Sequence, residues 1–167
     1  MAANNLRVLK HGMTVQRFRT ILNVELGIEA GDAVLAAKQT GANYVSLALD
    51  GDPEQGTDIF AGITKSASTA TATVDGTIDV ELCVPGTVIE GKANTVGNIA
   101  TDAALLGVLL DVVSFDRSAA TAAGTITIDE NEGSDPDVHG FMILDGRITD
   151  GMLFVTPCNA WIGRGLV

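Results

Sequence analysis

The densest group of residues that could do chemistry is the acidic stretch DENEGSDPD at residues 129–137, in which five of nine side chains are carboxylates. Asp129, Asn131 and Gly133 stand at alternate positions, as in calcium-binding loops, because oxygen ligands must converge from a tightly turned backbone. The register differs from that of an EF-hand, since the glycine is the fifth residue and no Glu occupies the twelfth position. The stretch is therefore predicted to be a solvated turn between two strands, with calcium binding as the alternative.

Other kinds of catalytic site are poorly supported. Acid–base catalysis by Asp129 and Glu132 would need a cleft that desolvates one carboxyl group, and nothing in the loop supplies apolar walls. His11 and His139 are not paired with a nearby Ser or Cys in a nucleophile motif. Neither a GxGxxG nor a GxxxxGK[ST] phosphate-binding motif occurs. We therefore predict that the chain is not an enzyme and uses no cofactor and no metal.

The cysteines and the apolar runs bear on the compartment. Cys83 and Cys158 form no CxxC motif, so we expect two reduced structural thiols and not a zinc site or a disulfide framework. The first 15 residues lack an apolar core followed by a small-residue cleavage site. The longest apolar run, at residues 103–110, is far shorter than the roughly 20 residues of a membrane span. Synthesis in a cytoplasm and no association with membranes are expected.

Charge is distributed unevenly along the chain. The formal net charge is -11, but residues 1–20 contain four bases and no acid, so the remainder has 6 bases against 21 acids. An acidic remainder should repel nucleic acid, because phosphate neutralisation requires clustered Lys and Arg. A segment that is both cationic and apolar is suited to lying on another protein's surface, the alternative being a solvated terminus. Residues 1–27 are therefore predicted to be an N-terminal docking arm. Its predicted contact residues are Arg7, Lys10, Arg17, Arg19, Leu6, Leu9, Phe18 and Ile21.

The elements that would position these groups are mostly short strands. From Ile28 onward, turn signals recur between short apolar runs, which predicts a mainly β domain at residues 28–167, an antiparallel β-sandwich or barrel. The clearest hairpin signal lies at residues 70–84, where Asp75-Gly76 fits a type I′ turn and Cys83 falls on the face opposite Ile78. One short helix is expected after a cap at Thr101 or its neighbour Asp102.

The order of these segments resembles the small β-rich head-decoration, or cement, proteins of tailed bacteriophages. The resemblance covers roughly residues 28–167. Its recurring features are an early strand containing Gly-Asp, a short helix in mid-chain and an acidic turn before a GxxIxxG strand. In this chain they correspond to GIEAGDAVLAA, NIATDAALLGVLLDVVSFD and TITIDENEGSDPDVHGFMILDG.

The resemblance implies a structural protein that binds the outside of an assembled phage capsid and stabilises it, often as a trimer. The implied partner is the phage major capsid protein, and the implied location is the exterior of the virion. Mass action supports such a role, because a ligand that binds only the assembled lattice stabilises that state. The alternatives are another virion β-module, from a tail or baseplate, and a small calcium-dependent binding domain.

Overall fold

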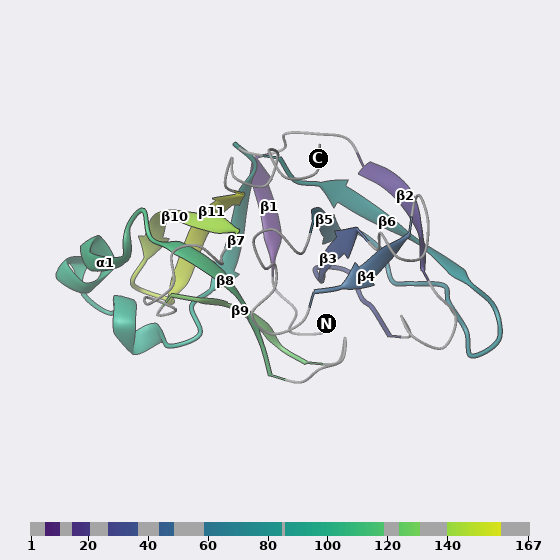
Figure 1. Ribbon diagram of the computed structural model, residues 1–167. Coiled ribbons are helices and arrows are strands. Elements are labelled where there is room, and N and C mark those ends of the chain that lie inside the picture. The colour runs from purple at the N-terminus through teal and green to yellow at the C-terminus, as the bar shows by residue number, and fades with distance from the viewer. Residues whose placement is uncertain are drawn as a thin grey trace.

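The chain is mainly β. The computed structural model describes residues 6–10, 15–20, 27–36, 44–48, 59–84, 86–118, 124–130 and 140–157. Within these residues it forms eleven strands, one short α-helix and one turn of 3₁₀ helix. The strands make two curled antiparallel sheets in a sandwich-like arrangement, and β1 (Arg7–Lys10) is the edge strand of the larger sheet on the side of the smaller one (Figure 1). The predicted fold class is confirmed. No helix in the described residues is long and apolar enough to cross a membrane.

The larger sheet has six strands in the order β1-β7-β11-β10-β8-β9. After β1, its members are β7 (Val88–Lys92), β11 (Met152–Pro157), β10 (Phe141–Arg147), β8 (Val112–Arg117) and β9 (Ile126–Asp129). Its far edge curls back, because Ile128 of β9 bridges Ala93 just after β7, and the Asn94 amide donates to the Ile128 carbonyl at 2.8 Å. The larger sheet therefore wraps around its own apolar side chains.

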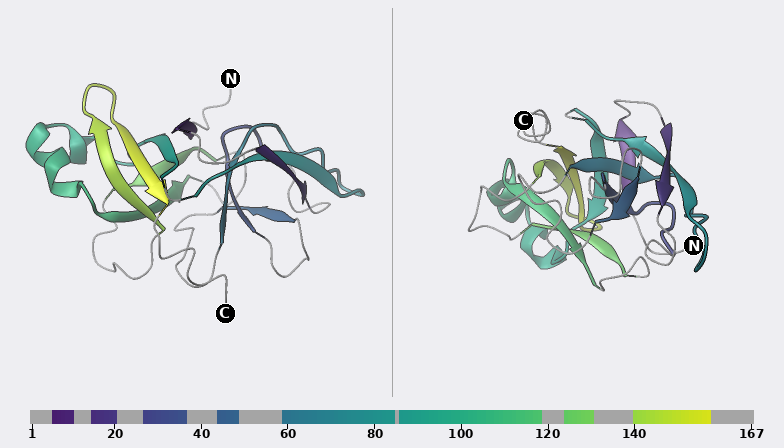
Figure 2. Two further views of the ribbon diagram at one scale, coloured as in Figure 1. Left: turned by 90° about the horizontal axis from the view of Figure 1, so that it is seen from above. Right: turned by 45° about the vertical axis from the view of Figure 1, so that its right-hand side comes forward.

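The smaller sheet has five strands in the order β2-β6-β5-β3-β4. They are β2 (Val15–Thr20), β6 (Gly76–Leu82), β5 (Phe60–Thr64), β3 (Ala33–Ala36) and β4 (Val45–Leu47). Its two edge strands approach each other, since Arg19 of β2 bridges Tyr44, the residue before β4. Figure 2 shows this sheet and the larger one side by side, with the helix at the far end of the larger sheet.

Two apolar cores lie on opposite faces of the smaller sheet. The larger core joins both sheets, and the Phe60 and Phe141 rings meet edge to face in it with centroids 4.9 Å apart. The smaller core includes Ile78 and Val80 of β6. Cys83 belongs to the larger core, which confirms its predicted placement opposite Ile78. Alternation along β6 divides these side chains, because successive residues of a strand point to opposite faces.

The helical segment follows the sequence prediction closely. The helix α1 (Asp102–Val108) is capped by Thr101, whose hydroxyl oxygen accepts a hydrogen bond from the Ala104 amide at 3.1 Å. A Thr in this position satisfies one of the amides that the first helical turn leaves without a partner. The 3₁₀ helix η1 (Val96–Ile99) precedes it and buries Ile99. Both helices cover one end of the larger sheet (Figure 1).

The predicted type I′ turn at Asp75-Gly76 is wrong. Neither residue has a positive φ, and the chain instead turns where the Thr71 amide donates to the Val74 carbonyl at 3.0 Å. Gly76 is required for another reason: a Cβ there would lie 2.0 Å from the Ala70 backbone nitrogen. The glycine marks a close approach of two chain segments and not a left-handed turn.

The expectation that every core strand begins after residue 27 is also wrong. β1 pairs with β7 in the larger sheet, and β2 pairs with β6 along its whole length in the smaller one. Leu6 and Val8 are buried in the larger core. The segment before residue 27 therefore supplies one edge strand to each sheet, because its alternating apolar residues find partners in the β body itself.

Candidate interaction surfaces

The exposed strand β2 presents two of the predicted docking cations. Arg17 makes a bidentate ion pair with Asp79, the residue opposite it on β6, at 2.8 and 3.0 Å. This hydrogen-bonded pair lowers the pKa of Asp79 and raises that of Arg17. Both groups lie at the surface, where water and salt screen their attraction. A partner's carboxylate can therefore replace Asp79 as the ligand of Arg17 at little cost in free energy.

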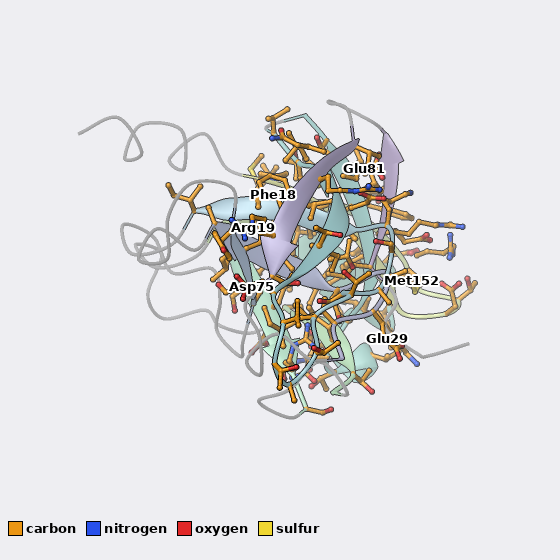
Figure 3. The ribbon with its side chains drawn as sticks, turned by 90° about the vertical axis from the view of Figure 1, so that its right-hand side faces the viewer. Phe18, Arg19, Glu29, Asp75, Glu81 and Met152 are labelled. Carbon is orange, nitrogen blue, oxygen red and sulfur yellow. The ribbon has the colours of Figure 1, made fainter. Side chains whose placement is uncertain are left out.

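Arg19 and Phe18 connect β2 to the opposite edge of the smaller sheet. The Arg19 guanidinium lies 4.8 Å from the centre of the Tyr44 ring and 3.7 Å from Asp75 Oδ2. The Tyr44 hydroxyl donates to the same carboxylate at 2.9 Å, and this hydrogen bond raises the pKa of Tyr44. Figure 3 shows the side chains of Phe18, Arg19 and Asp75 beside β2 and the start of β6. Phe18 packs against the smaller core.

β1 holds the remaining predicted contacts. Leu6 has 5% of its surface exposed and belongs to the larger core, so it is an anchor for its own chain and not for another subunit. Arg7 is exposed, and its guanidinium pairs with Glu90, the residue opposite it on β7. The side chains of Leu9 and Lys10, and all of Ile21, lie outside the described residues.

A cleft of about 440 Å³ lies where β1 faces the β5–β6 pair. Two buried carboxylates line it, Glu81 and Glu90. Lys65 Nζ lies 3.1 Å from Glu81 Oε2, while Glu90 accepts hydrogen bonds from both Arg7 and Arg147. Each carboxylate is thus neutralised by cations at the rim of the cleft. The arrangement joins β1 to its neighbours.

The first part of the acidic stretch has a structural role. Glu130 is buried, and its carboxylate accepts hydrogen bonds from the Thr95 amide and the Asn98 side chain, both at 3.0 Å. It therefore holds η1 against the end of β9. Within the described residues, no three His, Cys, Asp or Glu side chains gather to hold a metal ion. Residues 131–137 lie outside the described part, so the calcium alternative stays untested.

Cys83 is a buried free thiol. Burial raises its pKa to about 12, from an ordinary value near 9. A thiol that ionises so reluctantly is a poor nucleophile at neutral pH, because the thiolate is the reactive form. Cys83 therefore acts as a small apolar residue of the core. Cys158 lies outside the described residues.

Sequence reasoning missed a buried cation, Arg117. Arg117, at the end of β8, has no exposed surface on its side chain and pairs with Asp32, which is equally buried, at 3.2 Å. The two residues are 85 positions apart, and no spacing rule relates them. The available signal was modest: Arg117 ends an apolar strand and Asp32 precedes one.

No family model matches the chain, and no curated protein matches it either. What the protein does must therefore be inferred from its own surfaces.

Proposed function

We propose that the chain is a structural virion protein that binds the outer surface of an assembled phage capsid and stabilises it, acting as a trimer. The observation that supports this most is strand β2. It pairs with β6 on one side, whereas on its other side a single bridge joins Arg19 to Tyr44 in the described residues. Val15, Gln16 and Arg17 are exposed there. An edge of this kind can accept an extended segment of a partner.

The charges on β2 suit reversible recognition. Arg17 and Arg19 each face an acid of the same chain at the surface, and such exposed pairs contribute little to stability. A carboxylate from the capsid protein, or from a neighbouring copy, can replace the internal acid without burying an uncompensated charge. Rim charges of this type mainly set the rate of encounter and its dependence on salt.

The composition of the rest of the molecule agrees with a binding role. The chain has a net charge of -11, which keeps a particle covered with many copies soluble. Contacts repeated within a trimer and across the capsid lattice add avidity, so no single interface need be strong. In the described residues the buried acids Asp32, Glu81, Glu90 and Glu130 are all engaged in structural contacts.

The test is co-sedimentation with undecorated, expanded heads of the virus whose genome encodes the chain, over a series of salt concentrations. The chain should bind at low salt and dissociate as salt rises. The variant Arg17→Gln/Arg19→Gln should bind more weakly and with a flatter salt dependence. Lys92→Gln is the control, since it removes an exposed cation at the end of β7 in the other sheet.

Two results would contradict the proposal. The first is failure of the unaltered, folded chain to bind heads at any salt concentration. The second is a copy number in purified particles far below that of the major capsid protein, which would favour a tail or baseplate module. Sedimentation equilibrium of the free chain tests the trimer separately.

A further inference from the structure

Three exposed leucines gather at the end of the molecule that lies away from β2. Leu106 of α1 is 68% exposed, Leu110 just beyond the helix is 66% exposed, and Leu144 of β10 is 38% exposed. The Leu110 amide donates to the Ile143 carbonyl at 2.9 Å, so the segment after α1 runs beside β10. Figures 1 and 2 place α1 at the far end of the larger sheet, remote from β2. We call these residues the leucine surface.

The helix of this surface is apolar on the side that faces solvent. Leu105 and Val108 pack against the larger core, yet no residue of α1 is fully buried. An ordinary surface helix presents charged and polar residues opposite its core-facing stripe. Here Ala103, Leu106 and Gly107 are exposed instead. The outward side of α1 is thus suited to contact with another apolar surface.

The backbone is distorted at the two other leucines. Leu110 has φ = 71° and is the one non-glycine residue with positive φ in the described part of the chain. Leucine is a poor choice for this conformation, which Gly or Asn adopts readily. Leu144 is the extra residue of a β-bulge, since Ile143 pairs with Val155 and Asp145 with Phe154. Bulges redirect side chains and are over-represented next to functional sites. Strained backbone often occurs at functional sites. The strain that holds a leucine in solvent therefore suggests that this leucine binds a partner.

Acids surround the leucine surface. Asp102, Asp111 and Asp145 are exposed, and none forms an ion pair with another described residue. No Lys or Arg occurs between residues 93 and 111. A partner must therefore offer an apolar recess with a basic rim, because like charges facing each other across an interface are unfavourable.

A second copy of this chain fits that description poorly. Two leucine surfaces meeting around a two-fold axis would bring acid against acid. Outside β2, the described arginines are engaged with acids of their own chain, at Glu90, Asp32 and Asp150. A different protein that supplies the cations is the better match.

We propose that Leu106, Leu110 and Leu144 dock into an apolar recess, rimmed by Lys or Arg side chains, on a different protein. The proposal rests on the proposed function, under which that protein is the major capsid protein. Because β2 and the leucine surface lie apart, one copy then has two separate contact surfaces. The bulged and strained backbone holds the leucines outward before the partner arrives, which lowers the ordering cost of binding.

The experiment uses the full-length chain and undecorated expanded heads of the virus whose genome encodes it. Leu106→Gln/Leu144→Gln should weaken co-sedimentation by about tenfold or more. Leu110→Gly should weaken it too, while melting at no lower temperature than the unaltered chain, since glycine tolerates the positive φ. Val74→Gln is the matched control: Val74 is 60% exposed but lies beside the smaller sheet, and its replacement should leave binding unchanged.

The outcomes separate this proposal from the proposed function. If the unaltered chain binds heads and the leucine variants bind equally well, the leucine surface is not a docking site and the proposed function stands. If the unaltered chain does not bind heads, the proposed function and the docking role of the leucine surface are both contradicted.

Sedimentation velocity of the free variants gives a third outcome. Loss of a trimer in Leu106→Gln/Leu144→Gln would make a second copy the occupant, which overturns the inference. Circular dichroism melts within about 2 °C of the unaltered chain verify that the glutamine variants are folded.

Discussion

Arg117 and Asp32 form an ion pair between the two sheets in which neither side chain is exposed, with Nη2 lying 3.2 Å from Oδ1. The guanidinium also donates to the carbonyl of Ala48 at 3.0 Å and to that of Gly124 at 3.3 Å. Asp32 Oδ2 accepts from the Glu29 amide at 2.9 Å. A buried charge is tolerated only when its hydrogen-bonding capacity is met in this way. The pair thus fixes how β8 meets the start of β3.

The first prediction concerns this pair. Asp32→Ala or Arg117→Met should each lower the free energy of unfolding by about 3–5 kcal/mol, because each leaves a buried charge uncompensated. The double variant should lose much less than the sum of the two single variants. Urea denaturation followed by circular dichroism measures all three. The same cycle on the exposed pair Arg17 and Asp79 should give far smaller changes. Additive effects at Asp32 and Arg117 would mean that the ion pair does not couple the sheets.

The second prediction compares the two strands of the N-terminal segment. Leu6→Ala should cost about 2–5 kcal/mol of unfolding free energy, since Leu6 is part of the larger core. Val15→Ala on β2 should change it by less than about 0.5 kcal/mol, because Val15 is exposed. Deletion of residues 2–22 should leave a chain that cannot fold stably. If the deletion variant melts cooperatively like the unaltered chain, the N-terminal segment is a separate arm and not part of the β domain.

The third prediction uses the raised pKa of Cys83. Its folded pKa of about 12 exceeds the ordinary value near 9, so the folded state keeps the thiol proton in a range where the unfolded chain loses it. Stability from Cys83 is therefore full below pH 9 and is lost as pH rises toward 12, by about 1.4 kcal/mol per pH unit. Urea midpoints of the unaltered chain and Cys83→Ala should converge over that range. If the urea midpoints of the two proteins change with pH in parallel, this prediction is wrong.

The fourth prediction concerns metal. Glu130 already accepts two hydrogen bonds from the η1 region, so we expect a chelator to leave the melting temperature unchanged. Calorimetry with and without EDTA provides the measurement. A drop in melting temperature that calcium restores would show that the chain binds the ion and would revive the calcium-dependent alternative. Glu130→Ala should destabilise the chain by about 1–3 kcal/mol whether or not metal is present.

The strands and the helix could largely be predicted from local pattern. Alternating residues identified β6 and the face of Cys83, and Thr101 identified the start of α1, because these signals depend on neighbours within a few residues. The N-terminal segment was misread because its cations find acids far along the chain. Arg7 meets Glu90 83 residues later, and Arg17 meets Asp79 62 residues later. Periodicity along the sequence has no information about such partners.

The candidate surfaces were only partly predictable for the same reason. An excess of bases in residues 1–20 did indicate exposed cations, and Arg17 and Arg19 are exposed. The leucine surface could not be recognised in the run AALLGVLL, since any short helix of a β protein needs leucines for its core-facing side. The outward position of Leu110 depends on its positive φ, and that of Leu144, outside this run, depends on a bulge in β10; neither has a sequence signature.

The pairing of β1 with β7 has a consequence for how the protein is made. Residues 7–10 leave the ribosome well before residues 88–92, and β7 in turn needs β11, which ends at residue 157. The nascent chain therefore exposes the apolar side chains of Leu6 and Val8 during most of its translation. On a polysome, adjacent chains at the same stage offer each other equivalent unpaired strands. Exchange of β1 between copies is then the misfolding route that competes with correct folding.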